Sequence, residues 1–119
     1  MSGLVVSAND AKLVRQDGRD HFPDAPPADT VTVLDASVMP PRVLHTVEVS
    51  TSIVGPPQSV AISPDGRWVV VGSATHVDAG TLVLDDSITV VDLQAGPAAS
   101  TIDLGAHAQG IAFHPDGRL

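Results

Sequence analysis

The chain has 119 residues, a formal net charge of −8 and no cysteine, and 43% of its residues are hydrophobic. The absence of cysteine excludes disulfides, thiolate metal sites and cysteine nucleophiles. The acidic charge argues against a nucleic-acid partner, no apolar run approaches the ~20 residues that span a bilayer, and no signal peptide is visible at the start.

Short β-branched runs between prolines and glycines predict an all-β chain. The first run predicts a strand over residues 4–8. Residues 10–29 are polar and contain three prolines, which predicts a long loop without regular ladders. Residues 30–35 alternate with period two and predict a half-buried strand. After a break at Pro40-Pro41, residues 42–49 alternate again, which predicts a strand with one face made of Val43, His45, Val47 and Val49.

The second half of the chain predicts strands at 59–63, 68–73, 87–92 and 99–104. Pro64-Asp65-Gly66 forms a tight reversal, since Pro presets φ, Asp bonds its own backbone and Gly accepts positive φ. Residues 74–86 are expected to be a second long loop, with a short strand at 81–84 as an alternative. Residues 109–113 are expected to begin another strand.

An internal repeat organises these strands. Ser63-Pro64-Asp65-Gly66-Arg67 recurs as His114-Pro115-Asp116-Gly117-Arg118, and each copy follows a short apolar run. Residues 30–35 match residues 87–92 in the same way. We therefore expect the last three strands of one unit in residues 1–50, a complete unit in 51–105, and the first strand of a third unit in 106–119. On this interpretation the chain is part of a larger array.

Units of four antiparallel strands, repeated every ~40–60 residues, are typical of β-propeller blades. The predicted fold class is therefore a partial β-propeller made of four-stranded antiparallel blades. One blade leaves apolar faces uncovered, so the expected partners include further blades of the same propeller or other copies of the chain.

The order VAISPDGRWVVVGS, DDSITVVDL and STIDLGAHAQGIAFHPDGR resembles the YVTN-type β-propeller repeat. The same repeat style is similar to that of lactonase-like propellers and of amine dehydrogenase heavy chains. The resemblance implies a bacterial protein, periplasmic or extracellular, that acts as a scaffold or binding module for a protein or small ligand through its rim loops. The alternative that it leaves open is a fragment of a propeller enzyme, either a lactone hydrolase or an amine dehydrogenase subunit.

In such a propeller the loops 10–29, 51–58, 74–86 and 105–108 share one face, where ligands usually sit. Those loops carry His21, Asp24, His76, Asp78 and His107. Imidazole and carboxylate groups bind transition metals, so His76, Asp78 and His107 are the candidate ligands for a divalent metal. The competing interpretation is that these are ordinary solvent-exposed loop residues.

The remaining polar residues predict structural roles. Asp65 and Asp116 are turn formers, and Asp35 and Asp92 cap the turns that follow their strands. The neighbouring acids Asp85 and Asp86 are expected to point apart, which argues against an acid–base pair. No nucleophile elbow, phosphate loop or dinucleotide fingerprint occurs, so no catalytic residue is predicted and a binding module is favoured over an enzyme.

Overall fold

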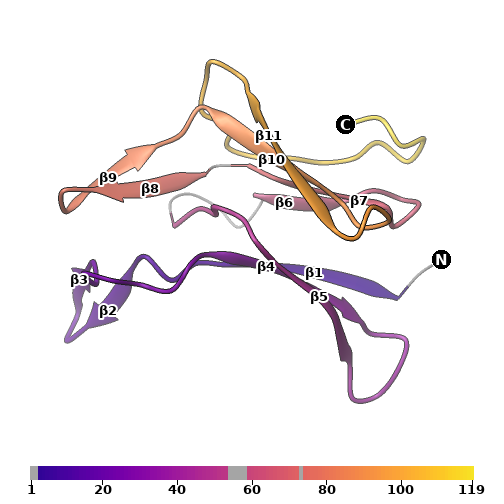
Figure 1. Cartoon of the computed structure of the whole chain (residues 1–119), viewed down its shortest axis with the longest axis horizontal. Helices are drawn as coiled ribbons and strands as arrows, with labels where there is room; N and C mark the ends of the chain where they lie inside the picture. Colours follow the sequence, from indigo (N-terminus) through magenta and orange to yellow (C-terminus); the bar gives the residue numbers. More distant parts are fainter. Residues whose placement is uncertain (1–2, 54–58, 73) are drawn as a thin grey trace.

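The computed structural model describes residues 3–53, 59–72 and 74–119. In this part of the chain every regular element is a strand, and the strands form two main antiparallel sheets and two small hairpins (Figure 1). No helix in it is long and apolar enough to cross a membrane. The predicted all-β class is confirmed.

The first main sheet contains β1 (Leu4–Asn9), β4 (Thr30–Asp35) and β5 (Arg42–Glu48), in the order β1-β4-β5. The alternation seen in the sequence places Val31 and Val33 of β4 in the core, fully buried, and leaves Thr30 and Thr32 on the opposite face. There the side-chain amide of Asn9 donates to both threonine hydroxyls, which satisfies polar groups on the half-buried face.

The prediction that Val43, His45, Val47 and Val49 share one face is wrong for Val43. Val33 pairs with His45, but the next residue, Leu34, pairs with Val43, so the register shifts between Val33 and Leu34. A bulge inserts Leu44 and reverses the direction of the side chains on one side of it. As a result Val43 is exposed, whereas Val47 is half-buried against the core.

The second main sheet contains β6 (Val60–Ile62), β7 (Trp68–Val71), β10 (Ser87–Asp92) and β11 (Ala98–Asp103), in the order β11-β10-β7-β6. These are the four strands that the repeat predicted. The turn between β6 and β7 has Gly66 at φ 72°, a backbone conformation that disfavours side chains. The prediction for residue 73 lies outside the described residues.

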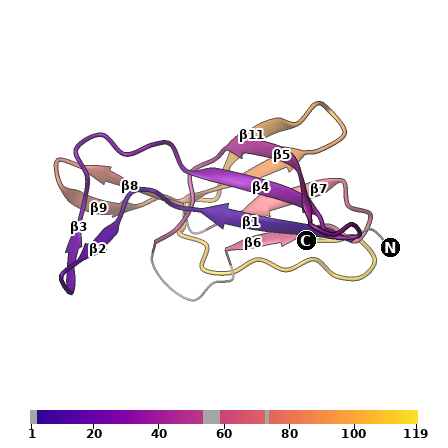
Figure 2. The ribbon, with the colours of Figure 1, turned by 90° about the horizontal axis from the view of Figure 1, so that it is seen from below.

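Both predicted long loops contain a hairpin. β2 (Val14–Gln16) pairs with β3 (Arg19–His21), and β8 (Thr75–Asp78) pairs with β9 (Thr81–Leu84). The prediction of a loop without ladders at 10–29 is therefore wrong, because the prolines follow the hairpin instead of interrupting it. Both hairpins extend from the same end of the molecule (Figure 2).

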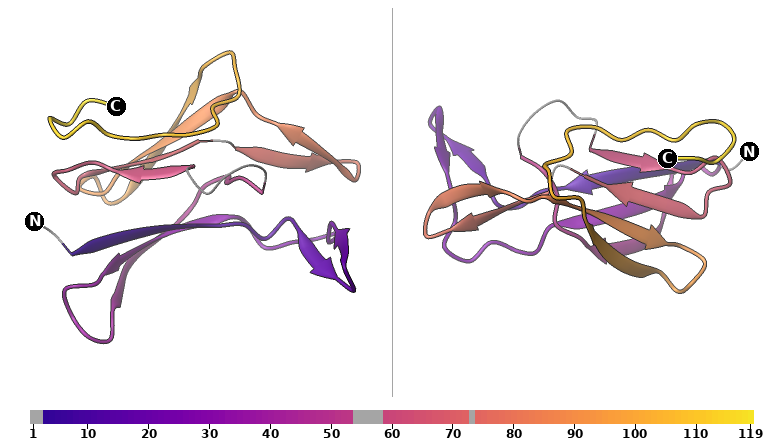
Figure 3. Two further views of the ribbon diagram at one scale, coloured as in Figure 1. Left: turned by 180° about the vertical axis from the view of Figure 1, so that it is seen from behind. Right: turned by 90° about the horizontal axis from the view of Figure 1, so that it is seen from above.

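The core lies between the two main sheets. Val31 and Val33 of β4 meet Val69 and Val71 of β7 and Val91 of β10. Figure 3 shows the two sheets as stacked layers, with the C-terminal segment running along the far side of the second sheet. β7 is consequently buried on both faces, since Val70 is also buried, which explains its continuous apolar sequence.

The expected strand at 109–113 is not formed. These residues are described, but they have no strand partner among the described residues. The segment nevertheless packs on the second sheet: a Cβ added to Gly72 would lie 2.7 Å from Cδ1 of Ile111. A strand needs hydrogen bonds to a neighbour, and packing on a sheet face does not supply them.

Candidate functional site

A cleft of about 530 Å³ separates the two hairpin regions at one end of the molecule. One wall consists of Phe22, Pro23, Asp24 and the following prolines, and the other of β8 and the turn at Ala79-Gly80. Both hairpin turns have two successive residues with positive φ, at Asp17-Gly18 and at Ala79-Gly80. Such turns match the twist of two-stranded ribbons. The β8–β9 ribbon forms one wall of the cleft, whereas the other wall is the proline-rich segment that follows β3.

A buried ion pair forms the base of the cleft. The ammonium group of Lys12 donates to the carboxylate of Asp29 and, at 2.9 Å, to the carbonyl of Thr51. The same carboxylate accepts from the backbone N–H of Ala11 at 3.1 Å and from the N–H and hydroxyl of Thr51 at 2.9 and 3.2 Å. Lys12, Asp29 and Thr51 are all buried, so a charge without a partner here would be costly.

The hydrogen bonds around Asp29 determine its protonation state. Burial on its own raises the pKa of this carboxyl group, but hydrogen bonds from Lys12, Thr51 and Ala11 and the charge of Lys12 outweigh it, and the pKa is lowered from its ordinary value. Asp29 is therefore ionised at neutral pH, and its charge cancels that of Lys12.

The network continues from Thr51 to Thr75 at the start of the β8–β9 hairpin. The carbonyl of Thr51 accepts from the N–H and hydroxyl of Thr75 at 3.2 and 3.1 Å. The hydroxyl of Ser50 donates to the carbonyl of Thr75 at 3.0 Å. Because Thr75 begins β8, these bonds hold the two walls of the cleft at a fixed separation.

The candidate metal ligands lie near one another, but both histidines form hydrogen bonds with Asp85. Nδ1 of His76 lies 2.8 Å from a carboxylate oxygen of Asp85, and Nδ1 of His107 lies 2.8 Å from the carbonyl of Asp85. Asp78 shares the exposed face of β8 with His76, and among the described residues it makes no hydrogen bond to either histidine. Within the described ranges, no group of three His, Asp or Glu side chains is arranged to hold a metal ion.

Asp85, for which the sequence predicted no binding role, contacts both histidines. Its side chain faces His76 and its carbonyl receives the Nδ1–H of His107, since a carbonyl only accepts. Nε2 of His107 is buried and has no hydrogen-bond partner among the described residues. Of the other rim residues, Asp24 lines the cleft, whereas His21 ends β3 outside it. In the predicted rim loop 51–58, residues 54–58 lie outside the described part.

The predicted turn roles of the aspartates are confirmed. Asp65 accepts from Ser63 and from the N–H of Arg67, and Asp116 accepts from the N–H of Arg118. Asp35 and Asp92 accept from the N–H groups two residues on. The hydrogen bond from Ser63 is the main reason that the pKa of Asp65 is lowered.

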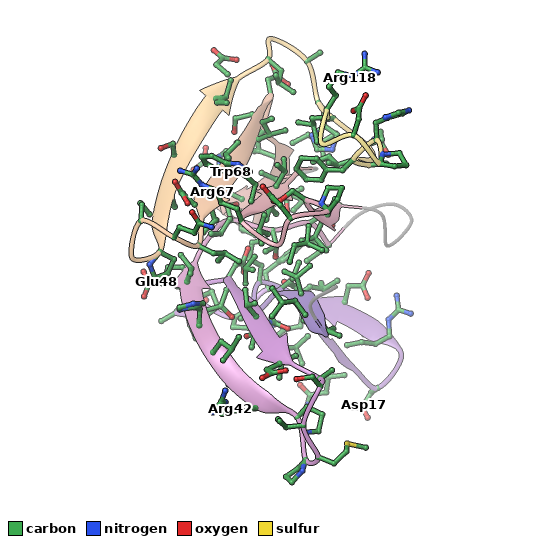
Figure 4. All side chains as sticks on the ribbon, turned by 90° about the vertical axis from the view of Figure 1, so that its right-hand side faces the viewer. Asp17, Arg42, Glu48, Arg67, Trp68 and Arg118 are labelled. Atoms are coloured by element: carbon green, nitrogen blue, oxygen red, sulfur yellow. The ribbon has the colours of Figure 1, made fainter. Side chains whose placement is uncertain are left out.

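Trp68 belongs to an ion-pair cluster on the second sheet. Arg67 binds both carboxylate oxygens of Asp92, at 3.2 and 2.8 Å, and its guanidinium carbon lies 4.5 Å from the centroid of the Trp68 ring. Figure 4 shows Arg67 beside Trp68, away from Arg42 on the first sheet. The cluster holds the first residue of β7 in place, and none of its residues lines the cleft.

No family model, curated protein or solved structure matches this chain.

Proposed function

We propose that the chain forms two successive blades of a YVTN-type β-propeller and acts as a binding module through the cleft between residues 22–29 and the β8–β9 hairpin. The observation that carries the proposal is the cleft itself, about 530 Å³ in volume, with a hydrogen-bonded base that links Lys12 and Thr51 to Thr75 of β8. Ligand sites are typically concave, largely apolar and equipped with a few fixed polar groups. The shared repeat sequence and the stacking of the two sheets support the blade assignment.

The lining of the cleft favours a ligand that combines an apolar body with a basic group. Phe22 and Pro23 supply apolar surface beside the carboxylate of Asp24, which has no ion-pair partner among the described residues. The one lysine in the lining is neutralised by Asp29. The chain as a whole carries a charge of −8, which raises the local concentration of cations.

A matched set of small aromatic probes tests this preference. Benzylamine, benzyl alcohol and benzoate share a ring and differ in charge. Followed by NMR, benzylamine should shift the amide signals of Thr75, His76 and Gly80 most strongly, and benzoate least. Equal responses to all three probes, or shifts spread over the whole chain, would contradict a cation-selective cleft.

Two variants locate the binding on one side chain. Asp24→Asn should weaken benzylamine binding several-fold, because it removes the unpaired charge from the wall of the cleft. The matched control is Asp17→Asn, which removes the same charge from the tip of the β2–β3 hairpin, and asparagine also tolerates positive φ. If both variants weaken binding equally, only the overall charge of the chain matters and the cleft is not the site.

A further inference from the structure

The two main sheets carry equivalent residue pairs with very different exposure. In the second sheet Val69 pairs with Val91, and in the first sheet Val5 pairs with Leu34 at the corresponding register. Val69 and Val91 are completely buried between the sheets, whereas Val5 is 48% exposed. The outer face of the first sheet therefore corresponds to the face of the second sheet that packs against its neighbour. In the second sheet this face is covered, whereas in the first sheet Val5 is left exposed.

The edge of the first sheet is open at the same place. β7 pairs with β10 on one side and β6 on the other, whereas β1 pairs only with β4 among the described residues. The sequence of β1, LVVSAN, contains no charged side chain, unlike β5 with Arg42 and Glu48. Charged side chains commonly protect sheet edges from pairing, so β1 is the edge best suited to receive a strand.

The chain also carries a strand-like sequence that has no strand partner among the described residues. Ile111-Ala112-Phe113 corresponds in the repeat to Val60-Ala61-Ile62, which forms β6. Residues 111–113 form no strand here, yet Ile111 packs against Gly72 on the outer side of the second sheet. They are therefore held where another sheet placed on that side could pair with them (Figure 3).

We propose that the open edge of β1 binds residues 111–113 of a second copy of this chain as a fourth strand. The register of β6 on β7 places Ile62 opposite Val69 and Ala61 opposite Val70. By the same register, Phe113 of the second copy pairs with Val5, and Ala112 pairs with Val6. The outer face of the first sheet then packs on the second sheet of that copy, and Val5 is covered.

The association is head to tail, because the donated strand and the receiving edge are different surfaces. Such contacts close into rings or extend as filaments. Each copy supplies two main sheets, and propellers close with ~4–8 blades, so a closed ring contains about two to four copies. This inference does not depend on ligand binding at the cleft, because its test measures association alone.

Sedimentation velocity on a dilution series provides the first test. The chain should form assemblies of two to four copies as its concentration rises. Val5→Lys should abolish them, whereas Val14→Lys should not, although Val14 is nearly as exposed at 45% and also lies in a strand. A chain that stays monomeric at all concentrations, or equal effects of the two substitutions, would overturn the proposal.

Backbone pairing is tested separately with Ala112→Pro. The N–H of Ser63 donates to the carbonyl of Trp68, and the carbonyl of Ser59 accepts from the N–H of Gly72. Alternate residues of an antiparallel strand bond the same neighbour. The N–H of Ala61, which lies between these two residues, therefore faces β7. By correspondence the N–H of Ala112 faces β1 of the other copy. Proline there removes this donor, and assembly should be lost while circular dichroism stays unchanged. Assembly that survives the proline would show that residues 111–113 are not the donated strand.

Cross-linking gives a positive readout, since the chain has no cysteine. A disulfide requires Cβ atoms about 4 Å apart. We therefore expect a mixed disulfide between a Val5→Cys copy and a mass-tagged Phe113→Cys copy. It should form several-fold faster than the disulfide between Val14→Cys and Phe113→Cys copies. Equal yields from the two mixtures would refute the register.

Discussion

The buried Lys12–Asp29 pair allows a sharp prediction for Asp29→Asn. The substitution keeps the size of the side chain but removes the charge that neutralises Lys12, whose ammonium group otherwise donates, among the described residues, only to the carbonyl of Thr51. Breaking a buried ion pair by removing one partner typically costs ~3–5 kcal/mol. Small domains have a total unfolding free energy of ~5–15 kcal/mol, so Asp29→Asn should remove a large share of the stability.

Urea unfolding, followed by the fluorescence of the single tryptophan, measures this loss. The matched control is Asp20→Asn, which breaks the exposed pair with Arg15 in the same segment and should cost less than ~1 kcal/mol. The double variant Lys12→Met/Asp29→Asn should be more stable than Asp29→Asn alone, because no buried charge is left without a partner. A loss for Asp29→Asn no larger than that for Asp20→Asn would refute the reasoning.

Four further predictions concern pH, backbone geometry and packing. Because the pKa of Asp29 is lowered in the folded chain, its stabilisation should be complete above the unfolded value of ~3.9 and lost as pH falls through the folded value; acid titration of the wild type against Asp29→Asn measures the difference. Ala79 has φ 47°, so Ala79→Gly should stabilise the chain by up to ~1 kcal/mol in thermal melts, whereas Gly66→Val should destabilise it by at least ~1 kcal/mol. Gly72→Ala should push against Ile111 and accelerate hydrogen exchange in the C-terminal segment, and unchanged exchange there would contradict the packing described above.

Local sequence signals predicted most of the strands in the main sheets. Alternation in residues 30–35 and the continuous run at Trp68–Val71 reflect burial on one face and on two faces, respectively. The Pro-Asp-Gly turn was predictable because its residues restrict the backbone locally. The hairpin at Asp17-Gly18 had a usable signal too, an Asp-Gly pair between short polar strands, which the following prolines obscured.

The site was much less predictable. His76 was expected in a long loop, but it lies in β8, and its partner is Asp85 rather than Asp78, because β8 and β9 pair across their turn and bring the end of β9 back beside β8. Lys12 and Asp29 are 17 positions apart and have no local pattern that links them. Only the closure of the 10–29 segment brings their charges together.

The amino-acid sequence by itself determined the repeat, the all-β class and the faces of most strands, because alternation and turn chemistry act over a few neighbouring residues. Tertiary structure decided the bulge at Leu44, the buried ion pair beneath the cleft and the lack of a strand partner for residues 109–113 within the described part of the chain. These features depend on which segments meet in space. A strand sequence becomes a strand only when a neighbouring backbone supplies its hydrogen bonds, and a buried charge is tolerated only when its partner is brought to it.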